Sequence, residues 1–104
     1  MRVFLIRDQK GIRAQGEYDI ETKKMTVLAG SVVSDSVAKT AKFRGAKSIE
    51  KSRDGVLKGG VLQRDIAFTS ASTAANFVTG TSTNGLTAWK NEKGVSIKEM
   101  LSGV

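Results

Sequence analysis

The sequence predicts a small α+β domain, in which an antiparallel β-sheet packs with two or three short helices. Three strand-like segments joined by short polar turns open the chain, and helix-like segments with capping residues or glycine stops follow. The length of 104 residues suits one compact domain over residues 1–104. Hydrophobic residues make up 39% of the chain and charged residues 26%, which is typical of a globular domain and not of a disordered segment.

The first three segments predict a β-meander. Residues 2–7 form a short apolar run rich in strand formers. Residues 12–19 alternate between apolar and polar side chains, which indicates a half-buried antiparallel strand. Gly16 inside this segment marks either a bulge or a close packing contact. A polar turn leads to the third predicted strand, residues 25–29.

The middle of the chain is less regular. Residues 34–44 are polar and rich in small side chains, so we expect a loop, and residues 46–54 predict a short helix that Gly55 ends. Two apolar pairs, residues 56–57 and 61–62, flank a Lys-Gly-Gly segment that forms either a tight hairpin or an irregular crossover. Residues 66–68 alternate and can enter the sheet.

The C-terminal third carries the strongest local signals. Ser70 or Ser72 can cap a helix over residues 73–79, and Gly80 is its expected left-handed stop. The Asn84-Gly85 pair predicts a hairpin turn, so residues 86–90 are expected to form a C-terminal hairpin strand. Ser96 and Glu99 have the spacing of a capping box, which places a last helix after them.

The composition excludes several kinds of active site. The chain has no cysteine and no histidine, which removes disulfides, thiol nucleophiles, imidazole bases and the usual zinc ligands. Glu17 and Asp19 stand two apart on the polar face of a strand, and we interpret them as surface carboxylates and not as an acid–base pair. We therefore expect a protein that is not an enzyme and that uses no cofactor or metal.

No segment approaches the roughly 20 apolar residues that a membrane-spanning helix needs. The apolar run at residues 3–6 is too short for the core of a signal peptide. A chain without cysteine also fits a reducing compartment. We therefore expect a cytoplasmic protein with no membrane partner.

The positive charge is concentrated in one segment. The net charge is +7, and residues 39–64 contribute six of these charges through eight bases and two acids. Such a segment predicts a polyanionic partner, nucleic acid first, although a basic segment can also be a solvated surface. The eight bases are Lys39, Lys42, Arg44, Lys47, Lys51, Arg53, Lys58 and Arg64.

Two further residues are candidates for contact with nucleic acid. The amide of Asn84 can read a base edge or only shape the turn, and the indole of Trp89 can stack on a base or fill the core. The basic segment itself contains one aromatic residue, Phe43. Charge without stacking residues favours contact with a duplex or its backbone over the stacking of single-stranded bases.

Five short stretches in fixed order resemble the family called domain of unknown function 4357, and they are also similar to the RAMA-like domains associated with restriction enzymes and adenine methylases. The resemblance covers about residues 12–101. Two positions depart from it: Ala71 stands where members usually have proline, and Leu86 where they usually have a second tryptophan. The stretches are residues 27–31 (VLAGS), 68–75 (FTSASTAA), 78–80 (VTG), 84–86 (NGL) and 89–90 (WK).

The resemblance implies an α+β domain of the kind appended to nucleases and DNA methyltransferases of restriction–modification systems. It supplies no catalytic residue. We therefore expect a non-catalytic accessory or target-recognition module that binds DNA, with a larger nuclease or methyltransferase as a possible protein partner. The alternative is an adaptor that docks on another protein through an apolar or edge-strand surface, with no nucleic-acid role.

Overall fold

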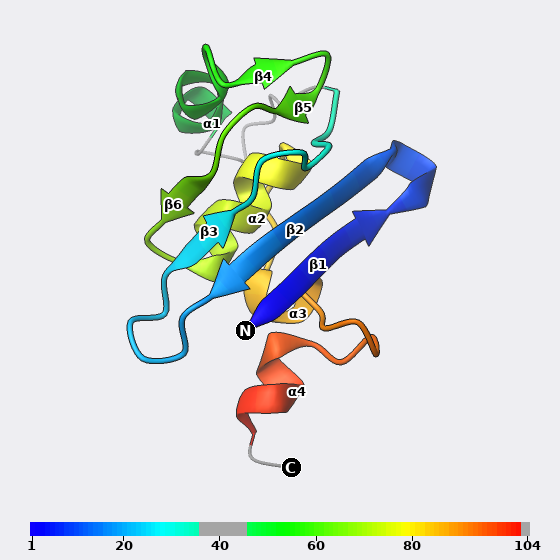
Figure 1. The fold of residues 1–104 in the computed structure, drawn as a ribbon, viewed down its shortest axis with the longest axis vertical. Coiled ribbons are helices and arrows are strands. Elements are labelled where there is room, and N and C mark those ends of the chain that lie inside the picture. The colour runs from blue at the N-terminus through cyan, green and yellow to red at the C-terminus, as the bar shows by residue number, and fades with distance from the viewer. Residues whose placement is uncertain (36–45, 103–104) are drawn as a thin grey trace.

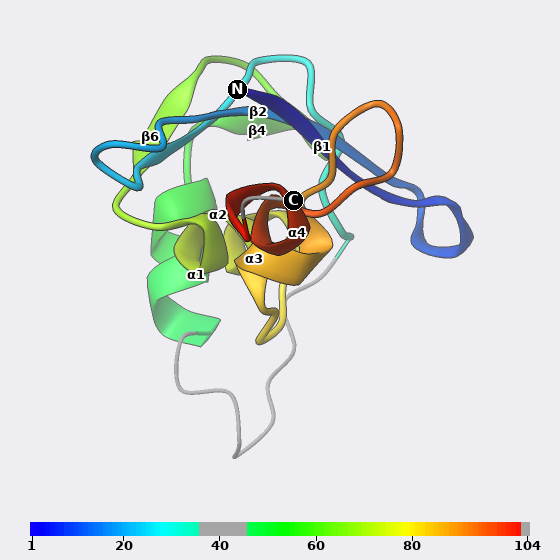
Figure 2. The same cartoon turned by 90° about the horizontal axis from the view of Figure 1, so that it is seen from below.

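The computed structural model describes residues 1–35 and 46–102, with the side chains of residues 46–48 left aside. These residues form two layers, an antiparallel sheet and a group of short helices that lie on one of its faces (Figures 1 and 2). The predicted α+β class is confirmed. Most of the loop predicted at residues 34–44 lies outside the described residues, together with Lys39, Lys42 and Arg44.

The main sheet has four strands in the order β1-β2-β3-β6, with every neighbouring pair antiparallel. The predicted meander is confirmed as β1 (Arg2–Arg7), β2 (Ile12–Tyr18) and β3 (Met25–Val27), and a 3-10 turn at Asp8–Lys10 joins the first two strands. The fourth strand is β6 (Ile66–Phe68), which pairs with β3.

Gly16 is a close packing contact and not a bulge. The register runs through it without interruption, with Val3 opposite it on β1 and Val27 on β3. A Cβ atom at this position would lie 2.8 Å from the Met25 sulfur and 3.3 Å from the ring of Trp89. Glycine is favoured here because Met25 and Trp89 both lie close to the backbone of β2.

The Lys-Gly-Gly segment forms a hairpin, which settles the choice between hairpin and crossover. β4 (Leu57–Lys58) pairs with β5 (Val61–Leu62), and Gly59 and Gly60 take positive φ angles of 59° and 80° in the turn. Val32 forms isolated bridges with Arg13 of β2 and Val61 of β5. Gly30, Ser31 and Val33 also form backbone hydrogen bonds with the hairpin, so the segment after β3 ties it to the main sheet.

Four short α-helices occur in the described parts of the chain, where two or three were expected. They are α1 (Ala46–Arg53), α2 (Ala71–Thr79), α3 (Gly85–Ala88) and α4 (Ile97–Leu101). Ser70, and not Ser72, caps α2, since its Oγ accepts a hydrogen bond from the Thr73 N–H at 3.1 Å. Gly80 ends α2 at a φ of 74°, and Ser96 caps α4 as predicted.

The predicted C-terminal hairpin strand at residues 86–90 is wrong. Asn84 has a φ of −77° and caps the one-turn helix α3, its Oδ1 accepting from the Leu86 N–H at 3.1 Å. Gly85 lies so close to the N-terminus of α2 that a Cβ atom would overlap the backbone of Ala71, and its N–H donates to Ser72 Oγ at 3.0 Å. This contact with α2 overrides the turn propensity of Asn-Gly.

The core lies between the sheet and the helices. α2 packs closely because Ala74 and Ala75 are fully buried and have small side chains. The largest fully buried side chains are Trp89 and Phe77, followed by Leu5, Ile12 and Met25. In the described ranges no helix has the length and apolar character that crossing a membrane requires.

Candidate nucleic-acid interface

Three of the predicted bases are exposed at one end of the molecule. Lys51 lies on α1, Lys58 on β4, and Arg64 between β5 and β6. Figure 1 shows α1 and the β4–β5 hairpin together at the end opposite α4. Within the described residues none of the three side chains has an ion pair. We call these three residues the basic end.

Carboxylates also lie in this part of the chain. Glu50 and Asp54 belong to the α1 region, and Asp65 follows Arg64 directly. The Oδ1 of Asp65 accepts a hydrogen bond from the Ala29 N–H at 2.8 Å. This carboxylate therefore joins the segment before β6 to the segment after β3. The excess of positive charge predicted for residues 39–64 therefore depends in part on the bases that lie outside the described residues.

Arg53, the last residue of α1, does not belong to the exposed set. Its guanidinium donates to the Phe77 carbonyl from Nε at 3.0 Å, to the Ser34 carbonyl from Nη1 at 3.0 Å, and to Ser34 Oγ from Nη2 at 2.9 Å. It also lies 5.7 Å from the centre of the Phe77 ring. Burial lowers the pKa of Arg53 from its ordinary value, yet arginine keeps its charge in proteins.

The position of Arg53 suits a structural role. The carbonyls of Phe77 and Val78 lie in the last turn of α2, where the helix dipole is negative and the carbonyls lack helical partners. A cation at this place therefore stabilises the end of α2 and joins it to α1. Each of its three side-chain nitrogens donates a hydrogen bond within the domain, so we remove Arg53 from the candidate interface.

Trp89 does not fit the stacking role that the sequence left open. Its side chain is fully buried, and its Nε1–H donates to the Ala71 carbonyl at 3.0 Å. It packs against Gly16 of β2 on its other side. An indole in this position cannot reach a base, so we remove Trp89 from the candidate interface as well.

Leu86, one of the two positions that depart from the family resemblance, is partly buried and packs against the hydrophobic core. This position therefore serves packing here. Asn84, at the start of α3, is exposed. It is separated from the basic end because α2 lies between α1 and α3 (Figure 2).

Asn84 lines a polar cleft of about 460 Å³ between β1 and the segment before Lys90. Arg7 and Lys90 are the charged residues of its lining, which contains no carboxylate. Neither residue was singled out from the sequence, because Arg7 ends an apolar strand and the charges of residues 65–104 balance. The cleft forms through tertiary contact between the two ends of the chain, and no local pattern signals that.

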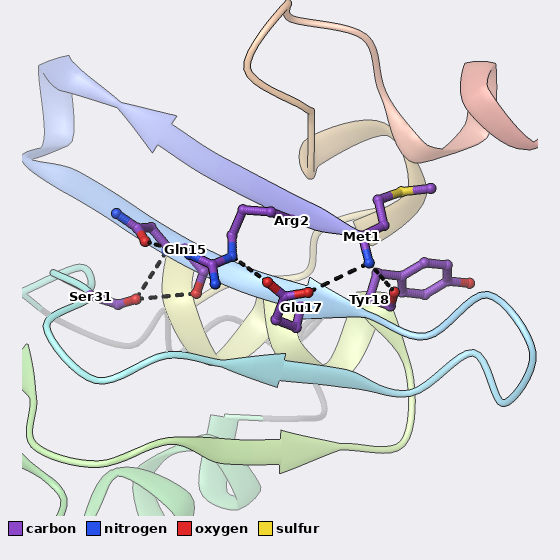
Figure 3. A network of polar contacts seen from close by, with 6 residues as sticks. All are labelled: Met1, Arg2, Gln15, Glu17, Tyr18 and Ser31. Carbon is purple, nitrogen blue, oxygen red and sulfur yellow. Dashed lines mark hydrogen bonds and ion pairs between the residues drawn. The ribbon is translucent and has the colours of Figure 1, made fainter.

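Glu17 on β2 and Asp19, directly after β2, act as structural ions. Figure 3 shows Glu17 between the side chain of Arg2 and the N-terminal amine of Met1, on the sheet face that the helices leave uncovered. The hydrogen bond from Arg2 is the largest effect that lowers the pKa of Glu17. Backbone N–H groups of Thr22 and Glu21 lower the pKa of Asp19 by hydrogen bonding. Both groups therefore stay ionised, which suits neither to act as a proton donor near neutral pH.

Replacing Glu17 by glutamine should cost little stability, and the cost should depend on pH. The folded pKa lies below the unfolded one, so the stabilisation is complete above the unfolded value and is lost as pH falls through the folded one. Because the pair is exposed, we expect a loss of at most about 1 kcal/mol near neutral pH. Urea unfolding at about pH 7 and about pH 2 measures it. An equal loss at both pH values, or an equal loss in the exposed control Glu92→Gln, would contradict this assignment.

Comparison with known proteins identifies the family of the chain. The family described as domain of unknown function (DUF4357) matches residues 4–101. No curated protein and no solved structure matches the chain. In the described ranges no group of three or more acidic, histidine or cysteine residues is arranged to hold a metal ion.

Proposed function

Because the chain belongs to the DUF4357 family, whose description assigns no activity, we propose its function from the structure: a non-catalytic accessory domain that binds nucleic acid, DNA first. The basic end, with the bases of residues 39–47 beside it in the sequence, holds the phosphate backbone. The resemblance to RAMA-like domains supports a place next to a nuclease or DNA methyltransferase. No cofactor or metal belongs to this proposal.

The observation that carries the proposal is the state of Lys51, Lys58 and Arg64. All three are exposed at one end of the fold and have no ion pair within the described residues. Cations in this state can neutralise phosphates without first breaking internal contacts. Each phosphate neutralised on a duplex releases counterions, which gives the binding its free energy and its dependence on salt.

The burial of aromatic side chains favours contact with the backbone over stacking on bases. Tyr18, Phe77 and Trp89 are buried, and Phe68 packs against Phe77 with the ring centres 5.0 Å apart. Proteins that bind single strands without sequence preference use exposed aromatic residues as stacking platforms. We therefore expect the domain to prefer duplex over single-stranded DNA and to discriminate weakly between sequences.

A titration with a 20-base-pair duplex, at about 50 and about 200 mM salt, tests the proposal. If the basic end neutralises three phosphates, the logarithm of the binding constant falls with a slope of about −2.7 against the logarithm of salt concentration, a loss of about 40-fold over this range. Further phosphate contacts from the bases of residues 39–47 would make this slope steeper. Absence of binding at the lower salt concentration, or binding that is indifferent to salt, would overturn the proposal.

A further inference from the structure

Strand β1 has an unpaired stretch of edge at Ile6. β1 lies at the edge of the main sheet, and Phe4 exchanges two hydrogen bonds with Lys90 on its outer side, at 2.7 and 2.9 Å. Backbone polar groups of alternate residues in a strand point the same way. The N–H and C=O of Ile6 therefore also point outward, and within the described residues nothing bonds to them.

Helix α3 explains why this edge is open. An antiparallel strand that pairs Lys90 with Phe4 would continue by pairing Ala88 with Ile6. Ala88 instead ends α3, which packs on α2 through the close contact of Gly85 with Ala71. The pair of Ala88 with Ile6 therefore does not form, and the polar cleft of about 460 Å³ lies where that strand would continue.

The cleft has the size and the chemistry of a peptide groove. It borders residues 4–7 of β1, which span about 10 Å at about 3.3 Å per residue. Its charged residues are Arg7 and Lys90, and Asn84 and Thr87 add polar groups. Ile6 itself exposes 52% of its surface on the sheet face that no helix covers, which offers an apolar contact to a side chain directly opposite.

We propose that the cleft binds an extended acidic peptide segment of a partner protein, which adds to β1 opposite Ile6 as a further strand. The main chain of the peptide satisfies both the N–H and the C=O of Ile6, which is the basis of recognition by strand addition. Its carboxylates meet Arg7 and Lys90. This site is separate from the basic end and does not depend on the nucleic-acid proposal.

The pairing requirement favours a peptide over a nucleic-acid backbone. A phosphate oxygen can accept a hydrogen bond from the Ile6 N–H, but it has no donor for the carbonyl beside it. The Ile6 carbonyl would then have no hydrogen-bond donor and would face the negative charge of the phosphate, which is unfavourable. An extended peptide supplies one donor and one acceptor at this spacing.

The probe is a capped eight-residue peptide that alternates valine or threonine with glutamate, added to the ¹⁵N-labelled domain. We expect the amide signals of Ile6 and its β1 neighbours to shift on binding. The same peptide with lysine in place of glutamate, and a thymidine octanucleotide, should leave them unmoved. Shifts at Ile6 with the oligonucleotide and none with the acidic peptide would overturn the proposal and assign the cleft to nucleic acid.

Ile6→Pro gives the sharpest variant. It removes the outward N–H, which has no partner to lose within the described residues, and proline is tolerated on edge strands when its nitrogen faces outward. We expect at least about a tenfold loss of peptide affinity, whereas Ile6→Thr, which keeps the N–H, should lose less than about threefold. Unchanged affinity in a folded Ile6→Pro protein would overturn strand addition.

A second variant keeps the test decisive if Ile6→Pro does not fold. Arg7→Glu with Lys90→Glu should abolish binding of the glutamate peptide and favour the lysine peptide. The matched control is Lys51→Glu with Lys58→Glu, which should retain the peptide and weaken duplex DNA. Equal peptide affinity in both double variants would contradict the cleft as the site. Duplex binding by the Arg7→Glu, Lys90→Glu variant tests the proposed nucleic-acid function separately.

Discussion

Replacing Trp89 by alanine is expected to cost about 3–5 kcal/mol of unfolding free energy, the range for deleting a buried tryptophan. The side chain is fully buried, lies against the backbone of β2 at Gly16, and donates to the Ala71 carbonyl at the start of α2. Its loss leaves a cavity where these elements meet. The total free energy of unfolding of a domain of this size is about 5–15 kcal/mol, so the variant should lose a large part of its stability. Urea unfolding followed by far-ultraviolet circular dichroism measures the change.

Trp89→Phe is the matched control for this variant. It keeps most of the buried volume and removes the hydrogen bond to Ala71, so about 1–2 kcal/mol should be lost. If Trp89→Ala costs less than about 1 kcal/mol, the indole is not a core residue, and stacking on a ligand becomes the better interpretation.

The Arg53→Ala variant is expected to lose about 2–4 kcal/mol, the second largest effect. One guanidinium donates to the carbonyls of Phe77 and Ser34 and to the Ser34 hydroxyl, and its removal leaves part-buried acceptors at the end of α2 without their donor. Hydrogen bonds to a charged donor contribute about 1.5–3 kcal/mol each, but bonds that share one side chain do not add. Thermal unfolding and urea titration both report this loss.

Two variants of α1 control the Arg53 experiment. Arg53→Lys keeps the charge but not the planar fork of donors, so it should recover less than half of the lost stability. Lys51→Ala removes an exposed base two residues earlier in the same helix and should change stability by less than about 0.5 kcal/mol. Equal losses at residues 51 and 53 would show that Arg53 has no special structural contacts.

The sequence predicted the elements whose signals are local. Alternation of polar and apolar residues located β2 within one residue, because one face of that strand is buried and the other is not. The capping serine and the glycine stop located α2 to within two residues, and the capping box located α4. These signals depend on the backbone bonds of neighbouring residues and need no tertiary information.

Local sequence signals are insufficient where tertiary contact decides the structure. Asn84-Gly85 has the strongest turn propensity in the chain, yet packing of Gly85 on α2 turns it into a helix start. Arg53 looks like its basic neighbours in sequence, and its partners lie 19 to 25 residues away. The cleft at Ile6 brings residues 4–7 beside residues 82–90. Charge counting and periodicity contain no information about these three contacts.

The proposed nucleic-acid interface depends on the three residues of the basic end. Variants that remove equal charge from different places test its role most directly. One variant changes Lys51, Lys58 and Arg64 to glutamine. The other removes the same charge elsewhere, by changing to glutamine the exposed residues Lys24, Lys93 and Lys98, which lie outside α1 and the β4–β5 hairpin. Both are titrated with the same duplex over a range of salt concentrations. We expect the first variant to flatten the salt slope by about 2 to 3 and the second by less than about 1. Equal slopes in the two variants would contradict a nucleic-acid interface at the basic end.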